Sequence, residues 1–340
     1  MKAAILREFK KPLTIEQTTN PDYGPDEVLI KVEACGVCHS DLHVAEGDWP
    51  QLMSMVKIKK PLILGHEVVG RVVERGQAVL HLDIGDRVGV ALLYSSCGDC
   101  EFCKEGQENL CPAQVMTGVT VDGGFAQFMK AKASHAIKIP EALTSAEAAP
   151  LFCAGVTVYR ALKKAGIQAN QRVAVFGVGG LGHLAVQIAK TYGAEVLAID
   201  IAEDKLELAR TLGADQVLNA ATSDVIAVLR GLGGVHVALV TSASKAAYDI
   251  ALYSLRPAGT LLVVGLPSED LTFPAIVMAS GESRFVASAF GTRDDLRETL
   301  ALAASGKLQC RVETRPLHQI NEIFDEMRCS KIIGRIVVTL

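Results

Sequence analysis

Hydrophobic and polar residues follow two different patterns along the chain, and the change comes near Ala148. Before this residue, short runs rich in β-branched residues are interrupted by Gly and Pro, a pattern typical of strands joined by turns. The predicted strands of this part are Val28–Val32, Val68–Val73, Gly85–Val90 and Gly123–Phe128. The first pattern therefore predicts a β-rich domain.

After this change, short apolar strands alternate with helical segments. The predicted strands are Val173–Phe176, Glu195–Ile199, Gln216–Leu218, Val235–Val240 and Thr260–Val264. The helix predicted at 203–212 carries apolar residues at helical spacing and ends at Gly213. Because strands and helices that alternate form βαβ units, we predict an α/β domain with a doubly wound parallel sheet. The pattern loosens after residue 290, and Ile332–Val338 is predicted as a strand that returns to the first domain.

Composition narrows the class of protein. The chain has 340 residues, which suits about two domains. It carries 34 Lys and Arg against 38 Asp and Glu, a net charge of −4, and this balance argues against a nucleic-acid partner and a membrane partner. Mean hydropathy is +0.28, yet every apolar run ends before the ~18 residues of a membrane helix. The first residues do not form a signal peptide, so we expect a cytoplasmic protein.

A glycine-rich loop directly follows the first strand of the second pattern. It consists of Gly177, Val178, Gly179, Gly180, Leu181 and Gly182. This is G-x-G-x-x-G between a strand and a helix, where glycines allow a pyrophosphate close to the backbone and to the helix N-terminus. Asp200 ends the next strand about 20 residues later, where a carboxylate binds the adenosine ribose, and Lys205 is a further ribose contact. The motif favours a dinucleotide over an ordinary glycine-rich turn, and Asp200 without an adjacent Arg favours NAD over NADP.

Cysteine is concentrated in two places that indicate metal. Four of the nine cysteines form one group: Cys97, Cys100, Cys103 and Cys111. Disulfides are rare in the cytosol, and four thiolates in a polar loop describe a closed structural zinc site, with an iron–sulfur cluster as the alternative. A second set, Cys38, His66 and Cys153, would leave a fourth position open, as catalytic zinc requires. Sequence spacing alone does not unite these three residues.

Further motifs resemble those of a known family. The residues Gly65-His66-Glu67-Val68-Val69-Gly70, continued by Gly76 and Val79, match the GHE-x2-G-x5-G-x2-V signature of the zinc-containing medium-chain alcohol dehydrogenases. The resemblance extends over residues 38–43, 47–50 and 152–157, the four-cysteine loop and the dinucleotide loop, and it is strongest to the bacterial type. It implies a GroES-like catalytic domain at 1–152 and 291–340, and a Rossmann domain that binds NAD at 153–290. It also implies a homotetramer, with a homodimer as the alternative.

The same resemblance implies roles for individual residues. Cys38, His66 and Cys153 would ligate the catalytic zinc, Glu67 would approach the metal, and Asp41 would orient His66. The implied proton relay consists of Ser40 and His43. The implied cofactor contacts are His39, Arg335, Val264 and Leu266, and the implied substrate pocket contains Trp49 and Leu92.

The implied reaction is a reversible hydride transfer between an alcohol and NAD. The alcohol would be primary, with secondary or aromatic alcohols as alternatives, and each chain would hold one catalytic and one structural zinc ion. A polyol-type dehydrogenase and a non-catalytic nucleotide-binding redox or zinc sensor are the alternatives. Two features depart from bacterial relatives: a longer segment at 51–60, which would narrow the pocket, and Leu92 in place of a tryptophan, which would widen it. Cys35, Cys310 and Cys329 are expected in the core.

Overall fold

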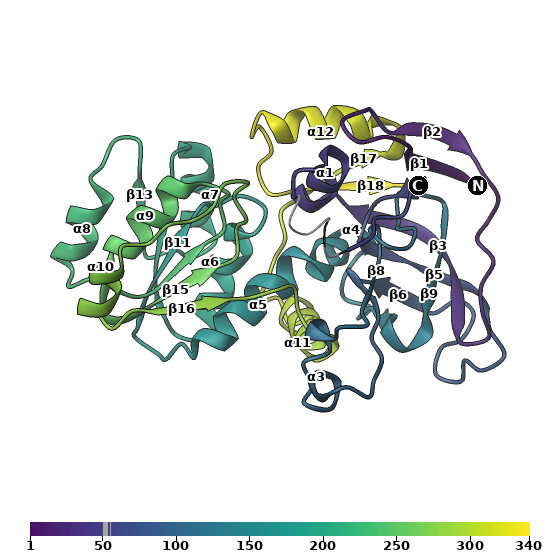
Figure 1. The fold of residues 1–340 in the computed structure, drawn as a ribbon, viewed down its shortest axis with the longest axis horizontal. Coiled ribbons are helices and arrows are strands. Elements are labelled where there is room, and N and C mark those ends of the chain that lie inside the picture. The colour runs from purple at the N-terminus through teal and green to yellow at the C-terminus, as the bar shows by residue number, and fades with distance from the viewer. Residues whose placement is uncertain (50–53, 55) are drawn as a thin grey trace. The chain divides into compact units, whose positions relative to one another are not determined.

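The computed structural model describes residues 1–49, 54 and 56–340. The chain divides into two compact units (Figure 1). The first consists of Met1–Val156, Gly291–Ala304 and Cys310–Leu340, and the second of Thr157–Phe290 and Ser305–Gln309. These limits differ from the predicted ones at 153–156 and at 305–309. At the first of these places, the helix α5 (Ala154–Ala165) begins in the first unit and continues into the second.

The first unit is built on a seven-stranded mixed sheet with the order β10-β6-β5-β3-β18-β17, in which β9 also pairs with β3. Its strands are β3 (Glu27–Gly36), β5 (Glu67–Arg75), β6 (Arg87–Val90), β9 (Phe128–Lys132), β10 (Ile137–Lys138), β17 (Val312–Pro316) and β18 (Arg335–Thr339). The long strand β3 is buried along most of its length, since it pairs with β5, β9 and β18. The C-terminal strand β18 therefore lies inside this sheet.

Smaller elements complete the first unit. The remaining strands are β1 (Lys2–Leu6), β2 (Thr14–Gln17), β4 (Leu62–Ile63), β7 (Leu93–Ser95) and β8 (Val115–Met116), and the helices are α1 (His39–Glu46), α3 (Glu101–Lys104), α4 (Ser145–Ala148), α11 (Arg293–Ala304) and α12 (Ile320–Arg328). Short 3-10 helices are η1 (Glu108–Leu110), η2 (Ala133–His135), η3 (Ala149–Phe152) and η4 (Leu317–Gln319). The helix α12 buries one apolar face, including Ile323 and Phe324, in the core that the strands share.

The second unit holds a six-stranded parallel sheet with the order β13-β12-β11-β14-β15-β16. The strands are β11 (Arg172–Phe176), β12 (Glu195–Asp200), β13 (Gln216–Asn219), β14 (Val235–Val240), β15 (Leu255–Val263) and β16 (Arg284–Ala287). The helices are α6 (Gly182–Thr191), α7 (Glu203–Thr211), α8 (Val225–Gly231), α9 (Lys245–Tyr253) and α10 (Ala275–Ser280). The predicted doubly wound sheet is thereby confirmed, and its strand order reverses beside β11, at the crevice where such sheets bind ligands.

Most predicted strands differ from the observed ones by a few residues at their ends, and two differ more. Strand β15 begins at Leu255, before the predicted Thr260. The strand predicted at Gly123–Phe128 is wrong, because β9 begins only at Phe128. The N–H groups of Gly123 and Gly124 donate instead to the carbonyls of Ile63 and Gly65, at 2.7 and 2.8 Å, so this stretch runs as a loop against β4.

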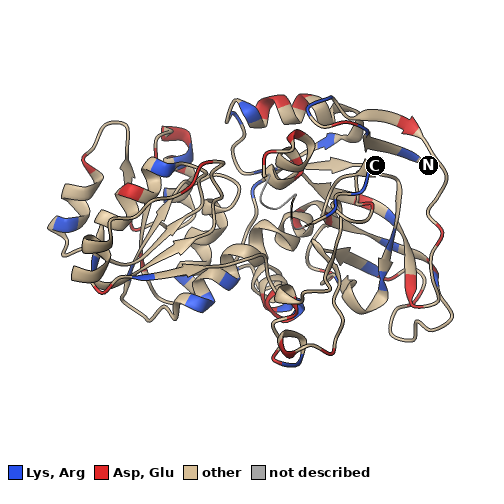
Figure 2. Ribbon diagram, in the orientation of Figure 1, with Lys and Arg blue, Asp and Glu red and all other residues tan. Residues whose placement is uncertain are grey.

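The distribution of charged residues and the character of the helices fit the expectations from the composition. Basic and acidic residues are interspersed on both units (Figure 2). Among the described residues, no helix combines the length and the apolar character needed to span a membrane.

Candidate metal and dinucleotide sites

The three scattered residues of the second predicted metal site come together within the first unit. Cys38 precedes α1, His66 and Glu67 stand at the start of β5, and Cys153 follows η3. Their donor atoms all lie within 4.8 Å of one another, and the Sγ atoms of Cys38 and Cys153 are 3.8 Å apart. Two sulfurs that each lie about 2.3 Å from one tetrahedral zinc ion are separated by about 3.8 Å. The spacing therefore fits a single zinc ion.

The imidazole of His66 is oriented toward this cluster by Asp41. His66 Nδ1 lies 2.9 Å from Asp41 Oδ1, and a carboxylate only accepts, so Nδ1 carries the hydrogen and Nε2 presents a lone pair. Asp41 also accepts the N–H groups of Cys38 and Gly65, at 2.9 and 3.1 Å. His66 Nε2 is buried and has no hydrogen-bond partner in the part of the chain that the structure describes. A buried polar atom without a partner is costly, and a metal ligand would satisfy it.

The charges around the cluster favour a thiolate at Cys38. Cys153, His66 and the guanidinium of Arg335 hold the pKa of the Cys38 thiol well below its ordinary value, against the effect of burial. The N–H of Ser40 points to the same sulfur at 3.5 Å, and Ser40 Oγ lies 3.6 Å from it. Thiolate is the form in which cysteine binds metal.

Glu67 and Arg335 form a buried ion pair beside the cluster. Both side chains are less than 5% exposed. Burial raises the pKa of the Glu67 carboxyl to about 7, although the guanidinium of Arg335 opposes this shift. The structure thus brings Glu67 to the predicted ligands, and it places Arg335, expected at a pyrophosphate, against Glu67.

The predicted relay residues project from α1. His43 is half-buried, its ring centroid is 4.5 Å from that of Trp49, and the exposed ring of His39 lies 6.3 Å away. His43 Nδ1 lies 2.9 Å from Asp48 Oδ2. Sequence reasoning missed Asp48. The available signal was Gly47, whose left-handed conformation (φ 73°) ends α1 and turns the chain back toward His43.

The predicted pocket residues are only partly placed. Trp49 packs against His43, and the half-buried Leu92 packs on the core of the first unit. Of the longer segment at 51–60, positions 51–53 and 55 lie outside the described residues, and with them the predicted effect of this segment on the pocket.

The four-cysteine loop forms a second cluster in the first unit, with all four sulfurs within 4.8 Å of one another. The Sγ atoms of Cys97 and Cys103 are 3.9 Å apart. The N–H groups of Asp99 and Cys100 point to Cys97 Sγ and lower the pKa of this thiol to about 6. The four thiolates of an iron–sulfur cluster are divided among two or four irons and do not all lie this close together, so the spacing favours one zinc ion.

The other three cysteines have different surroundings. Cys35 is buried as expected, whereas Cys310 is half-buried and Cys329 is exposed. The core assignment of Cys329 is wrong, because this residue stands just after the end of α12, beyond its apolar face.

The glycine-rich loop of the second unit has the geometry of a ligand cradle. Gly177 has a φ of 91°, and a Cβ on Gly182 would lie 1.8 Å from the Gly177 carbonyl oxygen, so the turn requires both glycines. At Gly179, by contrast, no atom of the described chain lies within 4 Å of the Cβ position. The N-cap of α6, Leu181, offers no side-chain cap. The N–H groups of His183 and Leu184 donate to the carbonyls of Gly179 and Leu181, at 3.2 and 3.1 Å, so an anion would be bound at the loop that precedes them.

The predicted ribose contacts, Asp200 and Lys205, and the predicted nicotinamide contacts, Val264 and Leu266, stand at the end of strands of this sheet or after them. Asp200 is 9% exposed and accepts the N–H groups of Val178, Ile201 and Ala202 at 2.7 to 3.0 Å. Lys205 is half-buried on α7. After β15, Val264 is buried and Leu266 is 52% exposed.

Comparison with known proteins agrees with both sites. Residues 24–141 match the family model described as alcohol dehydrogenase GroES-like domain, and residues 180–305 match the model described as zinc-binding dehydrogenase. An alcohol dehydrogenase of Geobacillus stearothermophilus is 48% identical over 339 residues, which cover 99% of each chain.

Solved structures show the same fold. The alcohol dehydrogenase of the hyperthermophilic archaeon Aeropyrum pernix is 37% identical and has a TM-score of 0.93, with 100% of both chains covered. The acetophenone reductase of Geotrichum candidum NBRC 4597, solved in complex with NAD, is 34% identical and has a TM-score of 0.89, with 100% of this chain and 97% of the other covered.

Proposed function

The chain belongs to the zinc-binding alcohol dehydrogenase family, and from this we propose which residues carry the reaction. It is a zinc-dependent alcohol dehydrogenase, an enzyme for reversible hydride transfer between an alcohol and NAD. The substrate we propose is a primary alcohol, with secondary and aromatic alcohols as further substrates, in keeping with the acetophenone reductase among its structural relatives. The observation that carries this function is the cluster of Cys38, His66, Glu67 and Cys153, with donor atoms within 4.8 Å of one another.

We propose two zinc ions per chain, one for each of the two clusters. Cys38, His66 and Cys153, with Glu67 beside them, would hold the catalytic ion, and Cys97, Cys100, Cys103 and Cys111 would hold a structural one. When bound, the catalytic zinc supplies a Lewis acid that polarises the oxygen of the alcohol or carbonyl. Asp41 keeps the His66 ring in the tautomer that presents Nε2. Arg335 balances the charge of the buried Glu67 carboxylate.

Ser40 and His43 would move the proton of the alcohol toward solvent. The hydroxyl of Ser40, 3.6 Å from the Cys38 sulfur, lies beside the proposed ligands. His43 stands one helical turn farther along α1, and its imidazole can accept and release a proton, which suits the outer end of a relay.

The glycine loop would hold the pyrophosphate of NAD. Gly177, Gly179, Gly180, Leu181 and Gly182 form the cradle, and the open space at Gly179 supports this assignment. The carboxylate of Asp200, with Lys205, would bind the adenosine ribose, and it would repel the 2′-phosphate of NADP. His39 and Arg335 would contact the pyrophosphate, and Val264 and Leu266 would lie beside the nicotinamide.

We also propose a homotetramer, with a homodimer as the smaller alternative, in the cytoplasm. Strand β16 is an edge strand of its sheet, and Ile276 on the neighbouring segment α10 is 76% exposed. An open strand edge with apolar residues nearby favours pairing with a second copy. All nine cysteines are free, which suits a reducing compartment.

An initial-rate panel tests the function. Ethanol, butanol, benzyl alcohol, a secondary alcohol and a polyol are each supplied with NAD and with NADP, beside a measurement of zinc per chain. We expect NADH formation from primary alcohols, two zinc ions per chain, and loss of turnover in Cys38→Ser. Faster oxidation of the polyol would indicate a polyol-type dehydrogenase, and a zinc-loaded chain without turnover would indicate a sensor.

A further inference from the structure

Asp48 is the carboxylate that holds the side chain of His43. The distance from His43 Nδ1 to Asp48 Oδ2 is 2.9 Å, and both side chains are partly buried. The contact is built into the end of α1, because the N–H groups of Gly47 and Asp48 both donate to the His43 carbonyl, at 2.9 and 3.1 Å. Trp49 packs on the same imidazole, with ring centroids 4.5 Å apart. The His43 ring is thus restrained by two residues of one tight turn.

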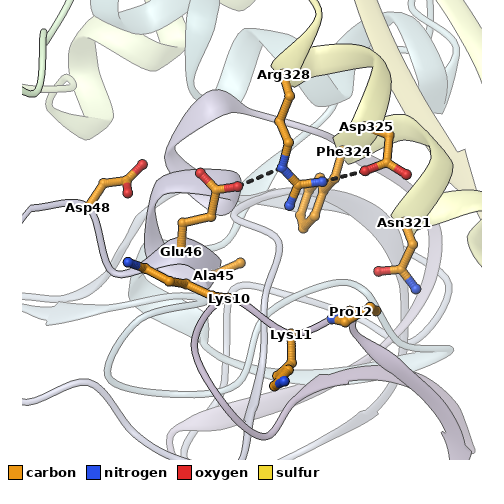
Figure 3. A pocket seen from close by; sticks show the side chains of 10 residues that line it. All are labelled: Lys10, Lys11, Pro12, Ala45, Glu46, Asp48, Asn321, Phe324, Asp325 and Arg328. Carbon is orange, nitrogen blue, oxygen red and sulfur yellow. Dashed lines mark hydrogen bonds and ion pairs between the residues drawn. The ribbon is translucent and has the colours of Figure 1, made fainter.

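The same carboxylate lines a cavity of about 500 Å³ in the first unit. The cavity lies between residues 10–12, the C-terminal end of α1 and α12, and Figure 3 shows Asp48 and Lys10 at one end and Asp325 and Asn321 at the other. Asp48 therefore contacts His43 and also lines this cavity.

The other charged groups that line this cavity either form ion pairs of their own or carry a positive charge, opposite to that of Asp48. Glu46 and Asp325 both pair with Arg328, the former at 2.6 Å. Lys10 and Lys11 are the remaining charged groups that line the described cavity wall. His39 lies beyond His43 on α1, with ring centroids 6.3 Å apart. Asp48 is thus the lining carboxylate that is paired with the relay histidine.

We propose that Asp48 is a positioning residue of the proton relay, which holds the imidazole of His43 in one tautomer and stabilises its protonated form; this rests on the proposed role of His43. A carboxylate accepts and does not donate, so Nδ1 carries the hydrogen and Nε2 is the atom that accepts a proton. When Nε2 accepts a proton, the carboxylate of Asp48 stabilises the imidazolium that forms. The imidazolium then releases the proton from Nε2 to water, and Nδ1 keeps its hydrogen on Asp48, so His43 returns to the neutral form that accepts the next proton.

The test compares wild type with Asp48→Asn, His43→Gln and the double variant. The readout is the transient rate of NADH formation with saturating benzyl alcohol, measured by stopped flow across a range of pH. We expect Asp48→Asn to slow this rate about tenfold, less than the ~10²-fold or more for loss of a whole general base. We also expect the acidic limb of its profile to move to lower pH, because the protonated imidazole loses its counter-charge. The double variant should be no slower than His43→Gln, since both residues act in one path.

Asp325→Asn is the matched control, because it removes the same charge from the same cavity without touching His43. Thermal unfolding and the KM for NAD are measured for each variant, and we expect wild-type values. If Asp48→Asn matches Asp325→Asn in rate and profile while His43→Gln is slow, the inference about Asp48 is wrong and the proposed relay stands. If His43→Gln has the wild-type rate, the proposed relay fails and the inference fails with it.

Discussion

Gly179 provides the sharpest test of the dinucleotide loop, because nothing in the described chain fills the space where its side chain would be. The nearest heavy atoms lie beyond 4 Å of the Cβ position, and its φ is not among the positive ones. The substitution Gly179→Ala therefore meets no steric obstacle in the folded protein. Because Ala reduces the freedom of the unfolded chain, the free energy of unfolding should stay constant or rise by up to about 1 kcal/mol.

The new methyl group should instead weaken the binding of NAD. A pyrophosphate that approaches the loop backbone would be displaced by the methyl, with loss of at least one charge-assisted hydrogen bond. Such a bond contributes about 1.5–3 kcal/mol, which corresponds to a rise of about 10- to 100-fold in the dissociation constant. We expect this rise in the KM for NAD from initial rates and in the Kd for NADH from fluorescence titration, with an unchanged thermal midpoint.

Two other glycines serve as controls for this experiment. Gly231, at the end of α8, also has no atom of the described chain within 4 Å of its Cβ position, so Gly231→Ala should preserve both stability and NAD binding. Gly182→Ala, which would place a Cβ 1.8 Å from the Gly177 oxygen, should lower stability. If Gly179→Ala keeps a KM for NAD within about twofold of Gly231→Ala, the pyrophosphate does not lie at Gly179 and the reasoning is refuted.

Three further predictions concern the metal clusters and a buried histidine. Asp41→Asn should weaken zinc binding at the catalytic cluster about 10- to 100-fold in chelator competition, because the His66 ring loses its acceptor; equal affinities would contradict this. Cys97→Ser should reduce zinc from two ions to one per chain, with a loss of stability of more than about 4 kcal/mol in denaturant unfolding; an unchanged unfolding curve would remove the structural site. Burial and the guanidinium of Arg293 lower the pKa of His135 to about 4 in the folded protein. As pH falls, the histidine is therefore protonated in the unfolded chain before it is protonated in the folded one. The free energy of unfolding should then decrease between about pH 6.5 and about pH 4, by at most about 3 kcal/mol. In urea unfolding across this pH range, the His135→Gln variant should not show this decrease in the free energy of unfolding. The same pH dependence in wild type and variant would contradict the prediction.

The sequence predicts best those features that depend on local pattern. Strands β11 to β15 and helices α6 and α7 follow from apolar periodicity, and glycines mark the ends of some of them, such as Gly177 after β11 and Gly213 after α7. The four-cysteine loop is equally local, since its ligands lie within one short stretch and converge as their spacing indicates. The strand wrongly predicted at Gly123–Phe128 shows the limit of this reasoning, because two glycines there bond to residues about 60 positions earlier.

Contacts between residues far apart in the sequence form the parts of the site that the local sequence pattern does not predict. Cys38, His66 and Cys153 meet because β3 pairs with β5, with Gly36 opposite Glu67, and because η3 ends against the same sheet. Without the family resemblance, nothing in the spacing of these residues distinguishes them from cysteines and histidines of a core. The contact between Asp48 and His43 is local in sequence, yet it depends on a left-handed Gly47 that the residue type permits and does not require.

The position of Arg335 shows how topology decides a residue's surroundings. Strand β3 pairs with β18 on one side and β5 on the other, and the register sets Gly36 opposite both Val337 and Glu67. Arg335, two positions before Val337, therefore reaches across Gly36 to Glu67, although 268 residues separate the ion pair in sequence. Gly36 makes the crossing possible, because a Cβ there would lie 1.8 Å from Glu67 Oε2. Gly36, at the end of a buried strand, thus leaves the space in which the carboxylate beside the proposed metal ligands meets its counter-charge.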